Sequence, residues 1–302
     1  KSIDTENWSV ISSIVPSTVG CMLCPAVEVP EQDKKLEETF SIKEEKTGAW
    51  LTRSVLDPYP YTHPMKFKLK EKREFGQKYN AHGWSEIVIE TRDHNKELND
   101  LNADEIKNIL LVYKNRLAEL SQRESVEYVS ITKDNLHVEF DHAYSKITTL
   151  PIVPQKIKEK MQKFHDYQFK NESCLYCDLI KNGAESRTVL ENDYFVALIP
   201  FSPHLSFQID IFPKKHHMTL ETLSDFEIFS LAETIKGILT RLKGAIKPFK
   251  FVLSFQLKPI KEEDFHFHVE IAQKTYHDSL YESYGLNLIK TSPEETAKIL
   301  RG

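Results

Sequence analysis

The four cysteines are the first residues of this 302-residue chain whose types and spacing suggest chemistry. They form two pairs with the same internal spacing, Cys21-x-x-Cys24 and Cys174-x-x-Cys177. In a reducing compartment such pairs bind metal more often than they form disulfides. A redox pair or two buried thiols would explain one pair, but the repetition favours metal for both.

Each cysteine pair is followed by two histidines. His94 and His142 follow the first pair and are 48 residues apart; His216 and His266 follow the second and are 50 apart. Two thiolates and two imidazoles satisfy tetrahedral zinc and leave no open coordination position. The sequence therefore predicts two structural zinc sites. His217 is an alternative ligand to His216, and the spacing of the repeat favours His216.

The segment Asp264–Ile271 carries further polar chemistry. Alternation along a strand puts His266, His268 and Glu270 on one face. Two imidazoles and a carboxylate make a poor core but a good binding or catalytic surface. The alternative is a half-buried strand with its polar side in water. A fainter copy of the segment lies earlier in the chain, at Phe140–Ile147.

The elements that position these residues also occur twice in the same order. The first copy predicts strands at Trp8–Ile11, Ser85–Glu90 and Tyr128–Ile131 and a helix at Asp104–Leu120 with Asn102 as its N-cap. The second predicts strands at Tyr194–Leu198, Phe207–Phe212 and Phe251–Phe255 and a helix at Asp225–Leu242. A helix at Lys156–Phe169 connects the copies.

We therefore expect an α+β fold of two tandem repeats related by a pseudo-twofold axis. Each repeat is expected to be a mostly antiparallel sheet with helices packed on one face. The expected domains are residues 1–150, a connecting helix at 151–170, and residues 171–302.

Composition excludes some classes of function. The net charge of −5 gives no basic surface for nucleic acid. No apolar run approaches the roughly 18 residues that a membrane span needs. The first residues lack the apolar core of a signal peptide, which predicts a cytoplasmic protein. With only nine glycines, a long glycine-rich phosphate loop is not expected.

Several landmarks in order resemble the galactose-1-phosphate uridylyltransferase family, a tandem relative of the histidine triad nucleotide-binding proteins. The resemblance covers nearly the whole chain and rests on Trp8–Ile11, Glu86–Thr91, Asp93–Lys96, Cys174–Cys177, Pro213–His216, Phe265–Ile271 and Ser292–Glu295. It implies a histidine-triad-like fold in each repeat, zinc, and a homodimer. It also implies a role in galactose metabolism, in which a nucleotidyl group moves between a nucleotide sugar and a hexose 1-phosphate.

The resemblance also implies site residues in the first copy. There the family carries a His-Pro-His motif whose first histidine binds zinc. The second attacks the α-phosphorus of the nucleotide sugar and becomes nucleotidylated. Here the motif reads His142-Ala143-Tyr144, with Lys146 in place of a glutamine. Tyr144 thus stands at the nucleophile position. A phenol of pKa near 10 needs activation, and Lys146 is the candidate group for activation and for nucleotide binding.

In the second copy, His268 occupies the position that corresponds to Tyr144, the nucleophile position of histidine triad proteins, with Glu270 as a candidate nucleotide contact. In the uridylyltransferases this histidine instead helps bind another metal, with a glutamate and a further histidine. Gln256 stands where that further histidine is expected, and Glu159 is a candidate carboxylate.

Three functional interpretations remain open. In the first, the chain is an active nucleotidyltransferase or phosphorylase that uses Tyr144 or His268. In the second, it binds a nucleotide or nucleotide sugar without transferring it. In the third, it is a scaffold that zinc stabilises and that binds a protein partner.

Overall fold

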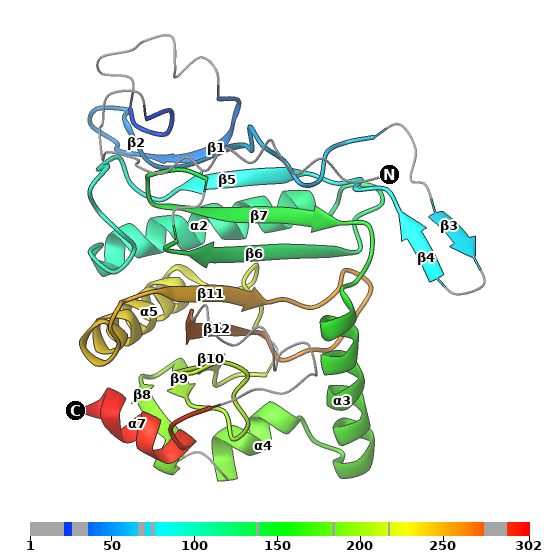
Figure 1. Ribbon diagram of the computed structural model, residues 1–302, viewed down its shortest axis with the longest axis vertical. Coiled ribbons are helices and arrows are strands. Elements are labelled where there is room, and N and C mark those ends of the chain that lie inside the picture. Colours follow the sequence, from blue (N-terminus) through cyan, green and yellow to red (C-terminus); the bar gives the residue numbers. More distant parts are fainter. Residues whose placement is uncertain are drawn as a thin grey trace, which may run out of the picture.

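One ten-stranded sheet runs through the computed structural model of the chain (Figure 1). The structure describes residues 21–25, 36–65, 70–73, 76–136, 139–182, 185–216, 218–274 and 289–302. The strand expected at Trp8–Ile11 and the alternative ligand His217 lie outside these ranges.

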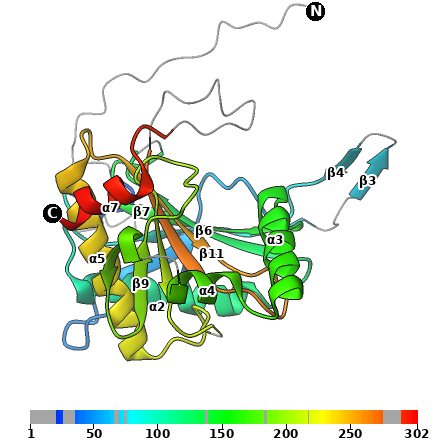
Figure 2. The ribbon, with the colours of Figure 1, turned by 90° about the horizontal axis from the view of Figure 1, so that it is seen from below.

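The strands of the large sheet follow the order β1-β2-β5-β7-β6-β11-β12-β10-β9-β8, and all their pairings are antiparallel. Their bounds are β1 Glu38–Lys43, β2 Trp50–Leu56, β5 Ser85–Ile89, β6 Tyr128–Asp134, β7 Tyr144–Leu150, β8 Thr188–Glu191, β9 Phe195–Leu198, β10 Ile209–Pro213, β11 Phe251–Gln256 and β12 His268–Gln273. A separate hairpin of β3 (Lys70–Arg73) and β4 (Gly76–Tyr79) projects from the body (Figures 1 and 2).

The strand order is symmetric about the junction of β6 and β11. Moving outward, β7, β5, β2 and β1 follow on one side, and β12, β10, β9 and β8 on the other. The two sheets expected from the sequence are therefore joined into one, by β6–β11 pairing that extends from Asp134 with Val252 to Ile131 with Phe255. This pairing covers an edge strand of each half. The expected domain boundaries at 150 and 171 stay a prediction.

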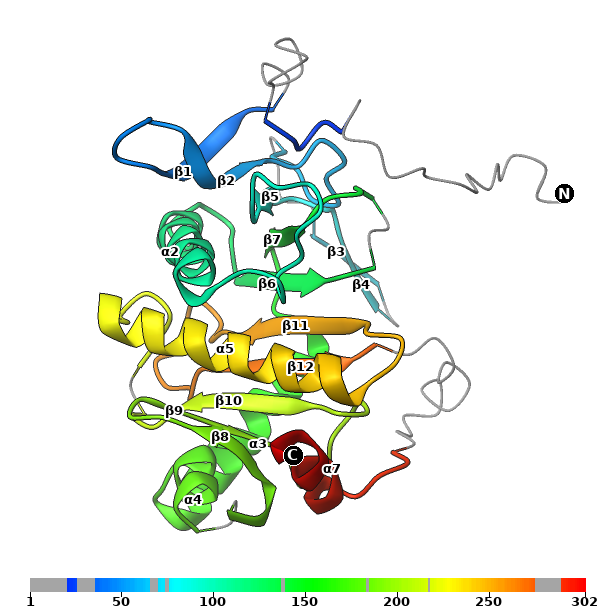
Figure 3. The same cartoon turned by 90° about the vertical axis from the view of Figure 1, so that its left-hand side faces the viewer.

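Two long helices cover one face of the sheet (Figure 3). They are α2 (Ala103–Leu120) and α5 (Asp225–Ala245). Each begins at a capping box, formed by Asn102 with Glu105 and by Ser224 with Glu227. Both helices bury an apolar stripe in a core cluster that takes residues from both halves of the sheet. The halves therefore share one core.

The remaining helical elements are α3 (Gln155–Asn171), α4 (Leu175–Asn182), the 3₁₀ turn η1 (Glu185–Arg187) and α7 (Pro293–Arg301). The helix expected at Lys156–Phe169 corresponds to α3, and the α+β class with its mostly antiparallel sheet is confirmed. However, α3 lies across the sheet from α2 and α5 (Figure 2). Helix α7 packs against α5 and joins the same core cluster, so α2, α5 and α7 follow the one-face expectation and α3 does not. No helix in the described ranges is long and apolar enough to cross a membrane.

Candidate functional site

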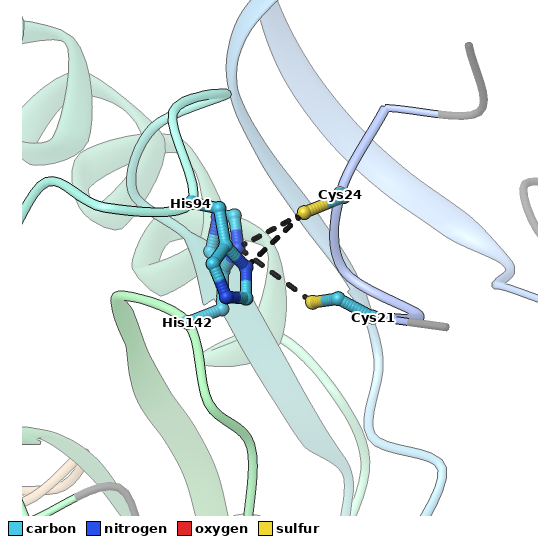
Figure 4. Close-up of side chains that lie close together, drawn as sticks. All are labelled: Cys21, Cys24, His94 and His142. Carbon is cyan, nitrogen blue, oxygen red and sulfur yellow. Dashed lines mark hydrogen bonds between the residues drawn. The ribbon is translucent and has the colours of Figure 1, made fainter. Parts of the chain in front are cut away.

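The first cysteine pair meets two histidines from distant elements (Figure 4). Cys24 Sγ lies 3.3 Å from His94 Nδ1 and 3.6 Å from His142 Nδ1, and Cys21 Sγ lies 3.8 Å from His142 Nδ1. One ligand atom from each of the four residues falls within 4.8 Å of all the others, so together they could hold a metal ion. His94 follows β5, and His142 comes shortly before β7.

The second pair forms an equivalent cluster. His266 Nδ1 lies 3.5 Å from both Cys174 Sγ and Cys177 Sγ, while His216 Nδ1 lies 3.5 Å from Cys177 Sγ and 3.4 Å from His266 Nδ1. A tetrahedral zinc ion with ordinary bond lengths separates sulfur and nitrogen ligands by about 3.6 Å and two nitrogens by about 3.3 Å. These four distances match the spacing that zinc requires, and all the ligand atoms lie within 4.8 Å of one another.

The outer ring nitrogens of these histidines also have partners. His142 Nε2 lies 2.9 Å from Thr91 O, and His266 Nε2 lies 2.8 Å from Pro213 O. His216 Nε2 lies 2.7 Å from a carboxylate oxygen of Asp264. An oxygen acceptor at Nε2 places the ring proton there and leaves the Nδ1 lone pair for a metal, the usual arrangement around ligating histidines.

The protonation states also suit metal binding. Burial lowers the pKa of His266 to about 4, which keeps its ring in the neutral form that ligates a metal. Burial and the neighbouring Cys21 raise the pKa of Cys24 to about 12, so this thiol needs a cation to ionise. The donor set, its spacing and its outer partners together fit zinc.

On the face of the sheet opposite α2 and α5, one row of residues crosses from one half to the other. Each residue in the row is the cross-strand partner of the next. The row runs from Lys146 through Thr132, Ser254 and Glu270 to Asp210. Directly paired residues share a face, so the side chains of Lys146 and Glu270 point to the same side of the sheet, although they come from different copies. Three strand spacings separate them, roughly 14 Å. We call this face the polar face.

At the first-copy end of the polar face, Tyr144 lies among carboxylates. Its ring meets that of Phe140 edge to face, with the ring centroids 5.2 Å apart. Burial and the charges of Glu139 and Asp134 raise the pKa of the Tyr144 phenol well above its usual range. The candidate activator Lys146 instead contacts carboxylates, with Nζ 2.5 Å from Glu139 Oε2 and 3.5 Å from Asp57 Oδ2. The site therefore favours a neutral phenol.

At the second-copy end, His268 is 1% exposed and has a defined orientation. Its Nδ1 lies 3.0 Å from His266 O, so this nitrogen carries the proton and Nε2 keeps a lone pair. Nε2 faces Lys160 Nζ at 3.4 Å and Glu270 Oε1 at 3.5 Å. Burial lowers the pKa of His268, which keeps the ring neutral.

Lys160 takes the position that the sequence predicts for Glu159. The Lys160 ammonium contacts Glu270, Gln256 and His268, whereas Glu159 is exposed and accepts a hydrogen bond from Gln155 Nε2 at 3.0 Å. The expectation for Glu159 does not hold, because the adjacent residue is the one that α3 turns toward the sheet.

Asp210 is a further buried carboxyl that the sequence analysis missed, although the sequence contains a signal for it. It interrupts an apolar run, Ile209-Asp210-Ile211-Phe212, in a strand that is buried throughout. It pairs directly with Glu270 and accepts a hydrogen bond from Gln208 Nε2 at 2.9 Å. Burial and the neighbouring Glu270 raise the pKa of Asp210 to about 7.

We predict that Asp210→Asn stabilises the fold, increasingly so as pH rises toward neutrality and just above it. A carboxyl whose folded pKa lies above its unfolded value loses stability as pH rises toward the folded pKa. The rise in pKa, from 3.8 to about 7, sets an upper bound of about 4 kcal/mol on the gain. Urea denaturation should show a gain about 1 kcal/mol larger at pH 8 than at pH 6. The exposed Asp193→Asn is the control, and a gain independent of pH would contradict the assignment.

The sheet has ten antiparallel strands, and each half carries a Cys₂His₂ cluster that could hold a metal ion. These features define a class of proteins with a tandem α+β fold and a candidate metal site in each half. Among curated proteins, the chain is 27% identical over 281 residues to the galactose-1-phosphate uridylyltransferase of Thermotoga maritima, a match that covers 88% of this chain and 83% of the relative. It is 24% identical over 230 residues to the ADP-glucose phosphorylase of Arabidopsis thaliana, a match that covers 72% of this chain and 64% of the relative. No protein-family model matches the chain.

Solved structures agree in fold. A uridylyltransferase structure superposes with a TM-score of 0.76 at 27% identity, covering 87% of this chain and 88% of the other. The Arabidopsis thaliana ADP-glucose phosphorylase with bound ADP-glucose superposes with a TM-score of 0.81 at 21% identity. This superposition covers 93% of this chain and 88% of the other. The resemblance to galactose-1-phosphate uridylyltransferases inferred from the sequence is confirmed.

Proposed function

We propose that this chain is a nucleotidyltransferase-like protein that acts on sugar phosphates, with a nucleotide sugar as donor and His268 as the covalent nucleophile. The names of the similar proteins, a uridylyltransferase and an ADP-glucose phosphorylase, support this type of activity. We further propose that each Cys₂His₂ cluster holds structural zinc, which contributes stability and no open coordination position.

The orientation of His268 carries the proposal. Because Nδ1 donates to His266 O, Nε2 presents its lone pair toward the polar face. In the first step Nε2 would form a bond to the α-phosphorus of the nucleotide sugar while the bond from phosphorus to the sugar-phosphate oxygen breaks. In the second step an incoming sugar phosphate would take the nucleotidyl group and release the imidazole.

Two neighbouring groups support His268 in this role. The Lys160 ammonium, 3.4 Å from Nε2, is placed to offset negative charge on the phosphoryl oxygens during transfer. His266, whose carbonyl orients His268, is itself part of the second cluster. Zinc in that cluster would fix the backbone that holds the nucleophile.

A second candidate function is binding of a nucleotide or nucleotide sugar without transfer. It is favoured by the burial of His268, which is only 1% exposed and packs against the rings of Tyr176 and Phe212. The Lys160 ammonium, paired with Glu270, also lies at its Nε2. A ligand phosphate would have to draw the lysine away from Glu270 before Nε2 reacts.

We predict that His268→Asn abolishes exchange of label between a nucleotide sugar and an isotopically labelled hexose 1-phosphate, whereas Tyr144→Phe leaves it intact. Loss of a nucleophile typically lowers the rate by at least about 10³-fold. UDP-glucose and ADP-glucose serve as donors, and zinc content and thermal melting verify that each variant is folded.

The other outcomes are also decisive. Loss of exchange in Tyr144→Phe would overturn the assignment of the nucleophile. Binding of either nucleotide sugar without exchange by the wild-type chain would select the second candidate. No binding at all would contradict both and leave the scaffold interpretation.

A further inference from the structure

The Lys160 ammonium lies in a cage of converging acceptors on the polar face. Its Nζ is 2.5 Å from Glu270 Oε1, 3.0 Å from Gln256 Oε1 and 3.4 Å from His268 Nε2. These atoms come from two neighbouring strands, β11 and β12, in which Gln256 pairs directly with His268. One imidazole nitrogen and two oxygens around a single point make a donor set that suits a divalent transition metal.

The cage is held in place by its own hydrogen bonds. Gln256 Nε2 donates to Ser254 Oγ at 2.9 Å and to Glu270 Oε2 at 3.0 Å, which turns the amide oxygen toward Lys160. The bond from His268 Nδ1 to His266 O fixes the imidazole in the same way. The three acceptors are thus preorganised around a cation and do not depend on Lys160 for their orientation.

The charges of the site also require a cation. Glu270 is paired directly with Asp210, so two carboxyl groups face each other on adjacent strands and repel when both are ionised. Like charges in this position destabilise a sheet unless a positive charge compensates them. The Lys160 ammonium, in contact with Glu270 Oε1, supplies that charge.

Helix α3 is anchored so that the lysine reaches this point. Phe164, one turn after Lys160, is fully buried and stacks on His216, with the ring centroids 6.3 Å apart. It also packs against Phe265, with centroids 5.9 Å apart. Because these partners belong to or adjoin the second Cys₂His₂ cluster, the position of Lys160 is set by a rigid part of the fold.

We propose that the Lys160 ammonium is a built-in cation that occupies a divalent-metal site, and that this site binds a metal ion when the ammonium is removed. The further metal that the resemblance implies for this region does not fit while Lys160 fills the cage. The covalently attached ammonium of Lys160 would then supply the positive charge that a bound divalent metal ion would otherwise supply. The inference concerns cation occupancy and stands whether or not His268 is a nucleophile.

Metal content tests the proposal directly. The wild-type chain, reconstituted with Co²⁺ and freed of excess ion, is expected to hold one ion in each Cys₂His₂ cluster. Lys160→Ala is expected to gain one further ion per chain. The double variant Lys160→Ala/Gln256→His should bind that ion more tightly, because imidazole is a better ligand than an amide oxygen for such metals. The added ion has no thiolate ligand, so it adds absorption without a sulfur-to-metal charge-transfer band.

Lys160→Arg is the matched control, since it keeps the positive charge and should not gain an ion. If Lys160→Ala does not fold, Lys160→Gln replaces it in the same test. A third ion in the wild-type chain would overturn the proposal. The proposal would also be overturned if Lys160→Ala, Lys160→Gln and the double variant all gained no third ion. This conclusion requires that each variant keeps the ions of its two Cys₂His₂ clusters and melts at the wild-type temperature.

Discussion

Replacing Cys174 by serine is expected to remove one zinc ion per chain and to lower the melting temperature of the whole fold sharply. Cys174 is buried, and its Sγ lies 3.5 Å from His266 Nδ1. The apparent binding free energy of structural zinc is about 10–16 kcal/mol in zinc-finger peptides, which is comparable to the whole stability of a typical domain. Loss of one ligand should therefore affect the fold far more than an ordinary core substitution.

The expected effect extends to the polar face. His266 belongs to the second cluster, and its carbonyl accepts the hydrogen bond from His268. The buried Phe164 of α3 packs on His216 of the same cluster. Without the metal, both supports of the Lys160 cage would loosen together.

Metal analysis and thermal melting followed by circular dichroism measure the effect. Lys181→Ala, at an exposed position on α4, is the control and should keep both ions. A Cys174→Ser chain that holds two zinc ions and melts at the wild-type temperature would contradict a structural role for this cluster.

The second large effect is expected at Lys133, a charged residue that is only 3% exposed. Its Nζ lies 3.1 Å from Glu90 Oε2 and donates to Tyr144 O at 3.0 Å. Lys133→Met would leave the buried Glu90 without its compensating charge. Breaking a buried ion pair by removal of one partner typically costs about 3–5 kcal/mol, and we expect a loss in that range.

Urea denaturation at neutral pH measures this loss. The double variant Lys133→Met/Glu90→Gln should recover most of it, because position 90 is then neutral and only the partly exposed Glu97, 3.9 Å from Lys133 Nζ, loses an ion-pair contact. Thr132→Ala, at the exposed neighbouring position, is expected to stay within about 0.5 kcal/mol of the wild type. A Lys133→Met chain as stable as the wild type would contradict the ion pair and show that Glu90 is neutral without the lysine.

The two clusters could be predicted because their information is local and repeated. Cys-x-x-Cys spacing and the matching intervals to His94, His142, His216 and His266 identified the residues that the structure brings together. The capping of α2 by Asn102 was likewise predictable from a few adjacent residues. Neither prediction required knowledge of how the elements pack.

The joined sheet and the Lys160 cage could not be predicted, because both depend on long-range packing. The contact of β6 with β11 joins residues more than 100 positions apart, and alternation within each strand carries no information about it. Whether Glu159 or Lys160 faces the sheet depends on the rotation of α3 about its axis. Lys146 lies on the face expected from alternation, but its partners Asp57 and Glu139 come from other segments.

The most direct test of covalent transfer by His268 is the intact mass of the chain after brief incubation with UDP-glucose or ADP-glucose, followed by peptide mapping. We expect an added nucleoside monophosphate on His268 that is lost in acid, because a phosphorus–nitrogen bond to imidazole is acid-labile. An acid-stable adduct on Tyr144, or binding of both nucleotide sugars with no adduct, would contradict covalent transfer by this histidine.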